Sequence, residues 1–218
     1  MDIFLKAILL LSGAALGYEL TDISQRLAQY KYRKKGLPLN DDPRFTALPA
    51  KLGLCVLNAA AWFLSGLLTD NFLIAALVSV LLSTALLTAL VDIRIRIIPN
   101  ELLLIMIVLG LAFQAVQFGL AAIMPALLCM AAMMLLFSAV AGFVGFDKVG
   151  AGDVKLAGAM GFALGYPVII SGLVIMSAVF VIFTLAGLLT KRLTLKTMVP
   201  FAPFMMTGMV FALIYAIY

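Results

Sequence analysis

Two acidic residues beside apolar segments are the side chains best suited to do chemistry in this chain. Asp92 directly follows the apolar run Leu81 to Val91, and Asp153 closes the sequence Gly150-Ala151-Gly152-Asp153. Ionisable groups in or at the ends of membrane spans are costly to place, so both are candidates for function. Two carboxyl groups held close together cannot both ionise cheaply, and one keeps its proton. Such a pair can deprotonate an attacking water and protonate a substrate carbonyl, which is the chemistry of aspartic proteases.

Residues near Asp153 are candidates for supporting the two carboxylates. Gly150 and Gly152 allow the backbone to approach a substrate strand closely and to adopt conformations closed to other residues. Lys155 follows two residues after Asp153. It can orient a carboxylate or the substrate, or it can mark the membrane interface as a snorkelling lysine.

Each of the two acids also has a purely structural interpretation. Asp153 could be the N-cap of the helix that follows, with Gly150 and Gly152 as ordinary turn residues. Asp92 could be a charge at the end of a span that pairs with Arg94 or Arg96. The occurrence of both acids at one side of the same membrane favours the catalytic interpretation.

The composition indicates a helical membrane protein. Hydrophobic residues make up 65% of the 218 positions and charged residues only 11%. Apolar runs of about twenty residues recur, which is the length that a hydrocarbon core of about 30 Å requires of a helix. We therefore predict an all-α polytopic protein with a single integral-membrane domain over residues 1–218. Its eight expected spans cover about 3–20, 52–69, 72–91, 101–118, 121–144, 153–165, 167–189 and 200–217.

The basic residues predict an orientation in the membrane. Fourteen of the 15 Lys and Arg residues fall in four alternate loops, and only Lys6 lies elsewhere. Because basic residues are retained on the cytoplasmic side of short loops, we expect the N-terminus outside and both acids at the cytoplasmic side. Topology accounts for the net charge of +5, and no nucleic-acid partner is expected. The polar stretch at about 21–51 is expected to be a cytoplasmic loop, with an interfacial helix over Ile23 to Lys34.

Several chemistries are excluded by residue type. The chain has no histidine, and its two cysteines, Cys55 and Cys129, lie far apart inside apolar runs. A Ser-His or Cys-His relay and a zinc site of the HExxH kind are therefore impossible. Neither cysteine has a partner at metal-binding spacing, so we expect no metal and no other cofactor.

The motifs around the two acids resemble those of type IV prepilin peptidases. The resemblance rests on Asp92 with the downstream Ile98-Pro99-Asn100, and on Gly150-x-Gly152-Asp153-x-Lys155-Leu156. The segment Pro200-Phe201-Ala202-Pro203-Phe204 resembles the last-span motif of that family. The GxGD element is shared with presenilin and signal peptide peptidase, but those enzymes place a Tyr where this chain has Val91. The resemblance implies that Asp92 and Asp153 are catalytic, and that Pro99 and Asn100 belong to the site.

The resemblance also implies a function. Such enzymes cut the short basic leader from type IV prepilins and pseudopilins at the cytoplasmic membrane face, just after a glycine. Many also methylate the new N-terminus, and those bifunctional members carry a larger cytoplasmic domain, often with four zinc-binding cysteines. This chain lacks those cysteines and resembles the smaller members, so the peptidase activity is expected and methyl transfer stays open.

Two other kinds of function stay open from the residues alone. A protease of the presenilin or signal peptide peptidase kind would use the same carboxylate chemistry on other membrane substrates. An ion-coupled transporter could use two acids at the membrane edge as carriers, although such sites usually lie near the bilayer midplane between repeats, and no repeat is evident. The expected partners are a prepilin or pseudopilin substrate and the lipid bilayer, and the sequence gives no oligomeric state.

Overall fold

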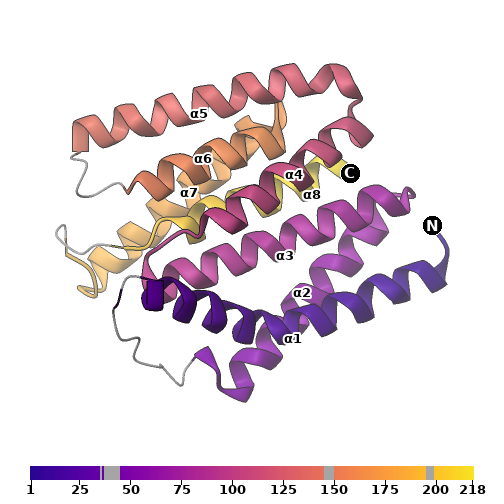
Figure 1. The fold of residues 1–218 in the computed structure, drawn as a ribbon, viewed down its shortest axis with the longest axis horizontal. Coiled ribbons are helices and arrows are strands. Elements are labelled where there is room, and N and C mark those ends of the chain that lie inside the picture. The colour runs from indigo at the N-terminus through magenta and orange to yellow at the C-terminus, as the bar shows by residue number, and fades with distance from the viewer. Residues whose placement is uncertain (35, 37–44, 145–149, 195–198) are drawn as a thin grey trace.

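The chain folds into helices that lie side by side in one bundle (Figure 1). The computed structural model describes residues 1–34, 36, 45–144, 150–194 and 199–218. Within these residues the helices are α1 (Ile3–Lys34), α2 (Leu48–Leu68), α3 (Phe72–Ile95), α4 (Asn100–Gln117), the short 3-10 helix η2 (Leu120–Ala122), α5 (Ile123–Val144), α6 (Ala151–Leu164), α7 (Val168–Leu189) and α8 (Ala202–Ile217). The predicted all-α class is confirmed.

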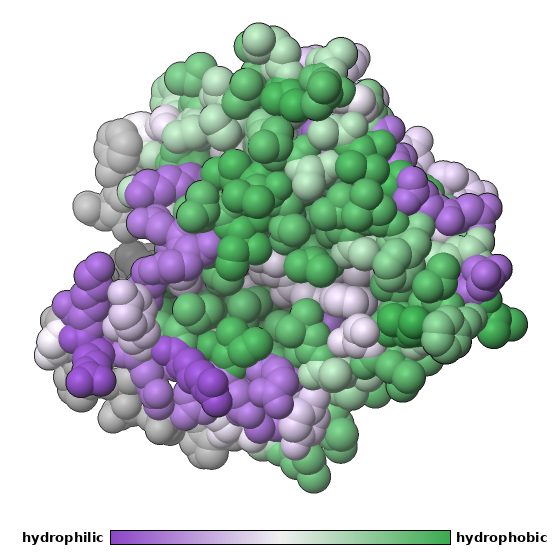
Figure 2. Space-filling model, turned by 45° about the vertical axis from the view of Figure 1, so that its right-hand side comes forward, coloured by the Kyte–Doolittle hydropathy of each residue, from purple (hydrophilic) through white to green (hydrophobic). Residues whose placement is uncertain are grey.

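Six of the described helices are long and apolar enough to cross a membrane. These are α1 to α5 and α7, whereas α6 has 14 residues and α8 has 16. Figure 2 shows hydrophobic residues over most of one face, with hydrophilic residues gathered mainly at the left-hand and lower left edges. This distribution is typical of a multi-pass membrane protein, because lipid contacts the apolar belt and water contacts its borders.

The polar stretch at about 21–51 is more helical than the sequence suggested. The helix expected over Ile23 to Lys34 is the second half of α1 and not a separate element. No glycine or proline occurs between Gly17 and Gly36, so nothing in the sequence breaks the helix where its hydropathy falls. Some of the acidic and basic residues in the predicted loops lie outside the described residues, namely Lys35, Asp41, Asp42, Arg44, Asp147, Lys148 and Lys196.

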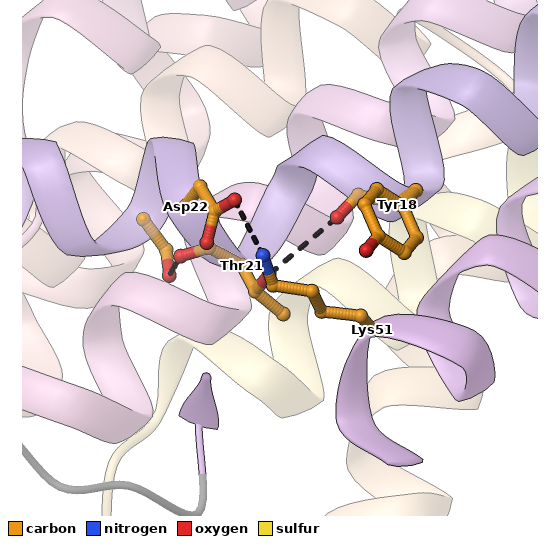
Figure 3. Close-up of polar contacts among 5 residues, drawn as sticks. Tyr18, Thr21, Asp22 and Lys51 are labelled. Carbon is orange, nitrogen blue, oxygen red and sulfur yellow. Dashed lines mark hydrogen bonds and ion pairs between the residues drawn. The ribbon is translucent and has the colours of Figure 1, made fainter. Parts of the chain in front are cut away.

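An ion pair joins the second half of α1 to the first turns of α2. The Nζ of Lys51 lies 2.6 Å from Oδ2 of Asp22 and 5.1 Å from the centre of the Tyr18 ring. Figure 3 shows the lysine amine pointing toward the Asp22 carboxylate, with the Tyr18 ring beside it. This ion pair therefore holds the start of α2 beside the second half of α1.

Buried hydrogen bonds connect α1, α2 and α3 deeper in the bundle. The Asn58 side-chain amide donates to the carbonyl of Gly13 at 2.8 Å, and its oxygen accepts from the Ser83 hydroxyl at 2.8 Å. The indole N–H of Trp62 donates to the same Ser83 oxygen at 2.8 Å. A polar group inside a membrane must find a partner within the protein, so these bonds fix how the three helices pack.

The central helix of the bundle is α3. In its most apolar 18-residue window 67% of the positions are buried, against 17% for the span that contains α5. The helix begins at the N-cap Asn71, whose side-chain oxygen accepts from the N–H of Leu73 at 3.0 Å. It ends where Arg96 adopts a left-handed conformation, with φ of 51°. The predicted third span stopped at residue 91, whereas the helix itself includes Asp92.

Close contacts at glycines hold α6 against α5 and α8 against α7. A Cβ at Gly208 of α8 would overlap the carbonyl oxygen of Gly172 in α7, and one at Gly161 of α6 would lie 2.7 Å from the carbonyl oxygen of Cys129 in α5. Only glycine permits approaches this close. In Figure 1 the C-terminal end of α3 and the N-terminal ends of α4, α6 and α8 all lie at the left-hand end of the bundle.

Candidate active site

Asp92 lies in the last turn of α3 and is 5% exposed. Its Oδ2 accepts a hydrogen bond of 3.1 Å from the backbone N–H of Ala202, the first residue of α8. The first N–H groups of a helix have no partner within that helix, and the N-cap residue Phe201 makes no side-chain cap. Asp92 therefore caps α8 from a different helix.

Asp153 is the third residue of α6, and Gly150 is the N-cap. The Oδ2 of Asp153 accepts from the N–H of Gly150 at 3.0 Å, and the N–H of Asp153 donates to the carbonyl of Gly150 at 2.9 Å. The structural interpretation of Asp153 as the N-cap is thus wrong in position, although its side chain does contribute to capping. This is one half of a capping box, in which the acid at the third position accepts the N–H of the N-cap residue, and glycine has no side-chain oxygen to form the other half.

Asp92 is in the last turn of α3 and Asp153 is in the first turn of α6, and these two helix ends lie at the same end of the bundle (Figure 1). The last turn of α3 and the first turn of α6 are joined through neighbours of the acids, because Ile98, which follows α3, packs against Gly152. Each acid uses its Oδ2 to accept a backbone N–H, and within the described part of the chain neither Oδ1 has a hydrogen-bond partner. One oxygen of each carboxylate is therefore available for a water molecule or a substrate group.

The segment between α3 and α4 lies between Asp92 and the turn that begins α6. The left-handed turn at Arg96 brings Ile98 against the α6 turn, where a Cβ on Gly152 would lie 3.4 Å from the Cβ of Ile98. Pro99 is the buried N-cap of α4, and its carbonyl accepts from Leu102 at 3.1 Å. Asn100 is exposed at the first position of α4. Ile98 therefore packs the first predicted motif against the second.

Two basic residues do not pair with Asp92 as the structural interpretation proposed. Among the described residues, none of the ion pairs involves Asp92, Arg94 or Arg96. The three guanidinium nitrogens of Arg94 are instead buried, and none has a hydrogen-bond partner in the part of the chain that the structure describes. The guanidinium carbon lies 5.4 Å from the centre of the Phe45 ring. Arg94 is thus turned inward, on a contact that does not involve the acids.

The remaining predicted site residue, Lys155, is exposed. It makes no ion pair with either carboxylate within the described residues. In the same part of the chain no group of three or more His, Cys, Asp or Glu side chains could hold a metal ion, and Cys55 and Cys129 are free.

The contact that sequence reasoning missed is the N–H of Ala202. The segment Pro200 to Phe204 stood out as a motif, but a backbone donor leaves no side-chain signal in the sequence. One indirect signal exists, because Pro203 has no N–H of its own and Ala202 is the donor next to it.

Comparison with known proteins places this arrangement in a family. The prepilin leader peptidase/N-methyltransferase of Bacillus subtilis (strain 168) is 30% identical over 166 residues, which are 76% of this chain and 64% of that protein. The chain thus spans less than two thirds of the length of this relative. No solved structure is a significant match. Residues 79–218 match the model of the type IV leader peptidase family. This match covers more than half of the chain and includes Asp92, Asp153 and Ala202, and the chain therefore belongs to the type IV leader peptidase family.

Proposed function

We propose that this protein is a membrane aspartic endopeptidase that removes the basic leader from type IV prepilins or pseudopilins, with Asp92 and Asp153 as its catalytic carboxylates. The observation that carries the proposal is that the last turn of α3, with Asp92, and the first turn of α6, with Asp153, lie at one end of the bundle. Each acid keeps one oxygen unengaged within the described residues. Membership of the type IV leader peptidase family supports both the chemistry and the class of substrate.

The proposed chemistry uses one ionised and one protonated carboxyl group. The ionised group takes a proton from a water molecule while the water oxygen attacks the carbonyl carbon of the scissile peptide bond. The protonated group gives its proton to the carbonyl oxygen, which yields a neutral tetrahedral intermediate. The intermediate collapses as the C–N bond breaks, and the leaving nitrogen receives a proton from the pair. No cofactor is required for these steps.

We further propose that the acids act at the cytoplasmic face and that the N-terminus lies outside. This orientation is supported by the basic residues of the alternate loops, which are retained on the cytoplasmic side. Substrate leaders with basic residues are held on that same side by the same rule. The proposal extends only to the peptidase activity of the relative from Bacillus subtilis, because the chain spans 64% of the length of that protein.

A cleavage assay with purified protein tests the proposal. The substrate is a peptide with a basic leader, a glycine at the cut and an apolar helix, and the variants are Asp92→Asn and Asp153→Asn. Asp70→Asn is the matched control, because Asp70 is exposed in the turn between α2 and α3 and pairs with the N-terminal amine. Each of the three variants replaces one carboxyl group with an amide of similar size.

We expect cleavage by the wild type and by Asp70→Asn, and loss of cleavage in both other variants while they stay folded. Cleavage that survives either Asp92→Asn or Asp153→Asn would overturn the two-carboxylate mechanism. If the wild type cuts a different membrane peptide but not this one, the proposed substrate is wrong and the mechanism is retained.

A further inference from the structure

Five phenylalanine side chains gather around the first turn of α8. Phe180 of α7 contacts Phe201 and Phe204, with ring centres 5.4 Å and 5.2 Å apart, and both contacts are edge to face. Phe201 and Phe204 also contact each other, with ring centres 6.2 Å apart. Phe137 of α5 lies 5.8 Å from Phe201, and Phe183 of α7 lies 5.2 Å from Phe204. We call these five residues the phenylalanine cluster.

The cluster flanks the amide that binds Asp92. Ala202 lies between Phe201 and Phe204 in the sequence and is fully buried. Its N–H donates to the Asp92 carboxylate. The first turn of α8 is therefore held in two ways, by ring contacts to α5 and α7 and by one hydrogen bond to α3. Edge-to-face aromatic contacts have a preferred geometry, so the rings limit how this turn can rotate.

The crossing of α7 and α8 determines where the central ring of the cluster lies. Gly172 and Gly208 bring the two helix backbones into direct contact. Phe180 lies about two helical turns beyond Gly172, and Phe204 lies about one turn before Gly208. Because the glycine contact fixes the separation of the helices, it brings the half-buried Phe180 ring into edge-to-face contact with Phe204.

We propose that Phe180 is a positioning residue for the peptidase reaction. Its ring holds the first turn of α8 in place, the turn holds the Ala202 N–H, and the N–H fixes the Asp92 carboxylate in the orientation needed for attack by water. This inference rests on the proposed catalytic role of Asp92. Phe180 itself touches neither carboxylate, and it acts through the Ala202 amide.

The test compares Phe180→Leu with Phe180→Tyr and with a matched core variant, Phe113→Leu. Phe113 is fully buried and contacts Phe118 edge to face, with ring centres 5.8 Å apart. It lies about 20 Å along α4 from Asn100, so it is remote from the acids. Two quantities are measured in each variant, namely kcat and KM for the leader peptide and the hydrogen-exchange rate of the Ala202 amide. Asp92→Ala supplies the exchange rate of an amide without its acceptor.

We expect Phe180→Leu to lower kcat by about 10- to 100-fold with KM within twofold, because a shift of about 1 Å in a reacting group has an effect of this size. The Ala202 amide should exchange at least tenfold faster, toward the rate in Asp92→Ala. Phe180→Tyr keeps the ring and should restore both values. Phe113→Leu should leave kcat and the exchange rate of the Ala202 amide unchanged, even if it lowers the unfolding temperature as much as Phe180→Leu does.

Two results would overturn the inference. In the first, the Ala202 amide of Phe180→Leu exchanges at the same rate as in the wild type. In the second, Phe113→Leu lowers kcat as much as Phe180→Leu does. If the wild type fails to cut the peptide, the proposed function fails, and the exchange measurement still decides whether the cluster holds the amide. Phe180→Met replaces the leucine variant if that variant does not fold.

Discussion

Asp92 has two roles that a pair of substitutions separates. Its carboxylate is a proposed catalytic group, and the same carboxylate caps α8 by accepting the N–H of Ala202. Asp92→Asn keeps an acceptor oxygen at the same place but removes the charge and the ability to exchange a proton. Asp92→Ala removes the acceptor as well. Both variants should lose cleavage, but the alanine variant should lose more stability than the asparagine variant.

The size of the stability difference follows from burial. Ala202 is fully buried, so Asp92→Ala leaves a buried N–H without a partner, which costs about 1–3 kcal/mol. Asp92→Asn exchanges a bond to a charged acceptor for a neutral one, a difference of about 1 kcal/mol or less. Removal of one member of a catalytic unit lowers kcat by roughly 10⁴-fold or more in other proteases, and both variants should show a loss of that order.

Equilibrium unfolding in mixed detergent micelles and peptide cleavage measure the two roles on the same preparations. We expect the free energy of unfolding to rank wild type and Asp92→Asn close together and Asp92→Ala about 2 kcal/mol lower. An asparagine variant that cleaves like the wild type would refute the catalytic role. An alanine variant as stable as the asparagine variant would refute the cap.

Three further predictions concern the packing of the bundle. Gly208→Ala should lower the free energy of unfolding by about 1–3 kcal/mol, measured by thermal melting, because the new methyl group would overlap the Gly172 carbonyl. Arg94→Met should raise the free energy of unfolding by about 1–3 kcal/mol, since it removes buried guanidinium nitrogens that have no hydrogen-bond partner among the described residues, and a decrease in the same melting experiment would refute this reasoning. Trp62→Phe should lower the free energy of unfolding by about 0.6–2 kcal/mol and leave kcat unchanged, because it removes the hydrogen bond from the Trp62 indole to Ser83. A double-mutant cycle with Ser83→Ala checks that the loss of this bond is the cause.

Helices were the most predictable part of this protein, because a segment in lipid must satisfy its backbone hydrogen bonds internally. The apolar runs therefore mark helices directly, and each of the eight expected spans corresponds to a described helix. The ends of the helices were less predictable. Hydropathy marks the border of the membrane, whereas α1 continues to Lys34 and α3 continues past Asp92 until a left-handed residue ends it.

The shared location of the two acids at one end of the bundle was predictable in part. Alternation of the basic loops indicated that Asp92 and Asp153 share one end of the bundle, and the structure has them there. Their hydrogen-bond partners were not predictable. The donor to Asp92 is a backbone amide 110 residues away, and any residue except proline carries such a donor. Arg94 was a possible ion-pair partner of Asp92, but its guanidinium lies over the Phe45 ring instead.

The capping of α8 by Asp92 also bears on how such a protein could change over evolutionary time. A gene duplicate that lost its enzymatic role would be free to lose the acid, but loss of the acceptor would leave the buried N–H of Ala202 without a partner. Replacements that retain a side-chain oxygen, such as asparagine, should therefore be tolerated in inactive descendants more often than alanine or valine. A surviving asparagine at this position would then identify a former enzyme that was kept for a task needing only its shape.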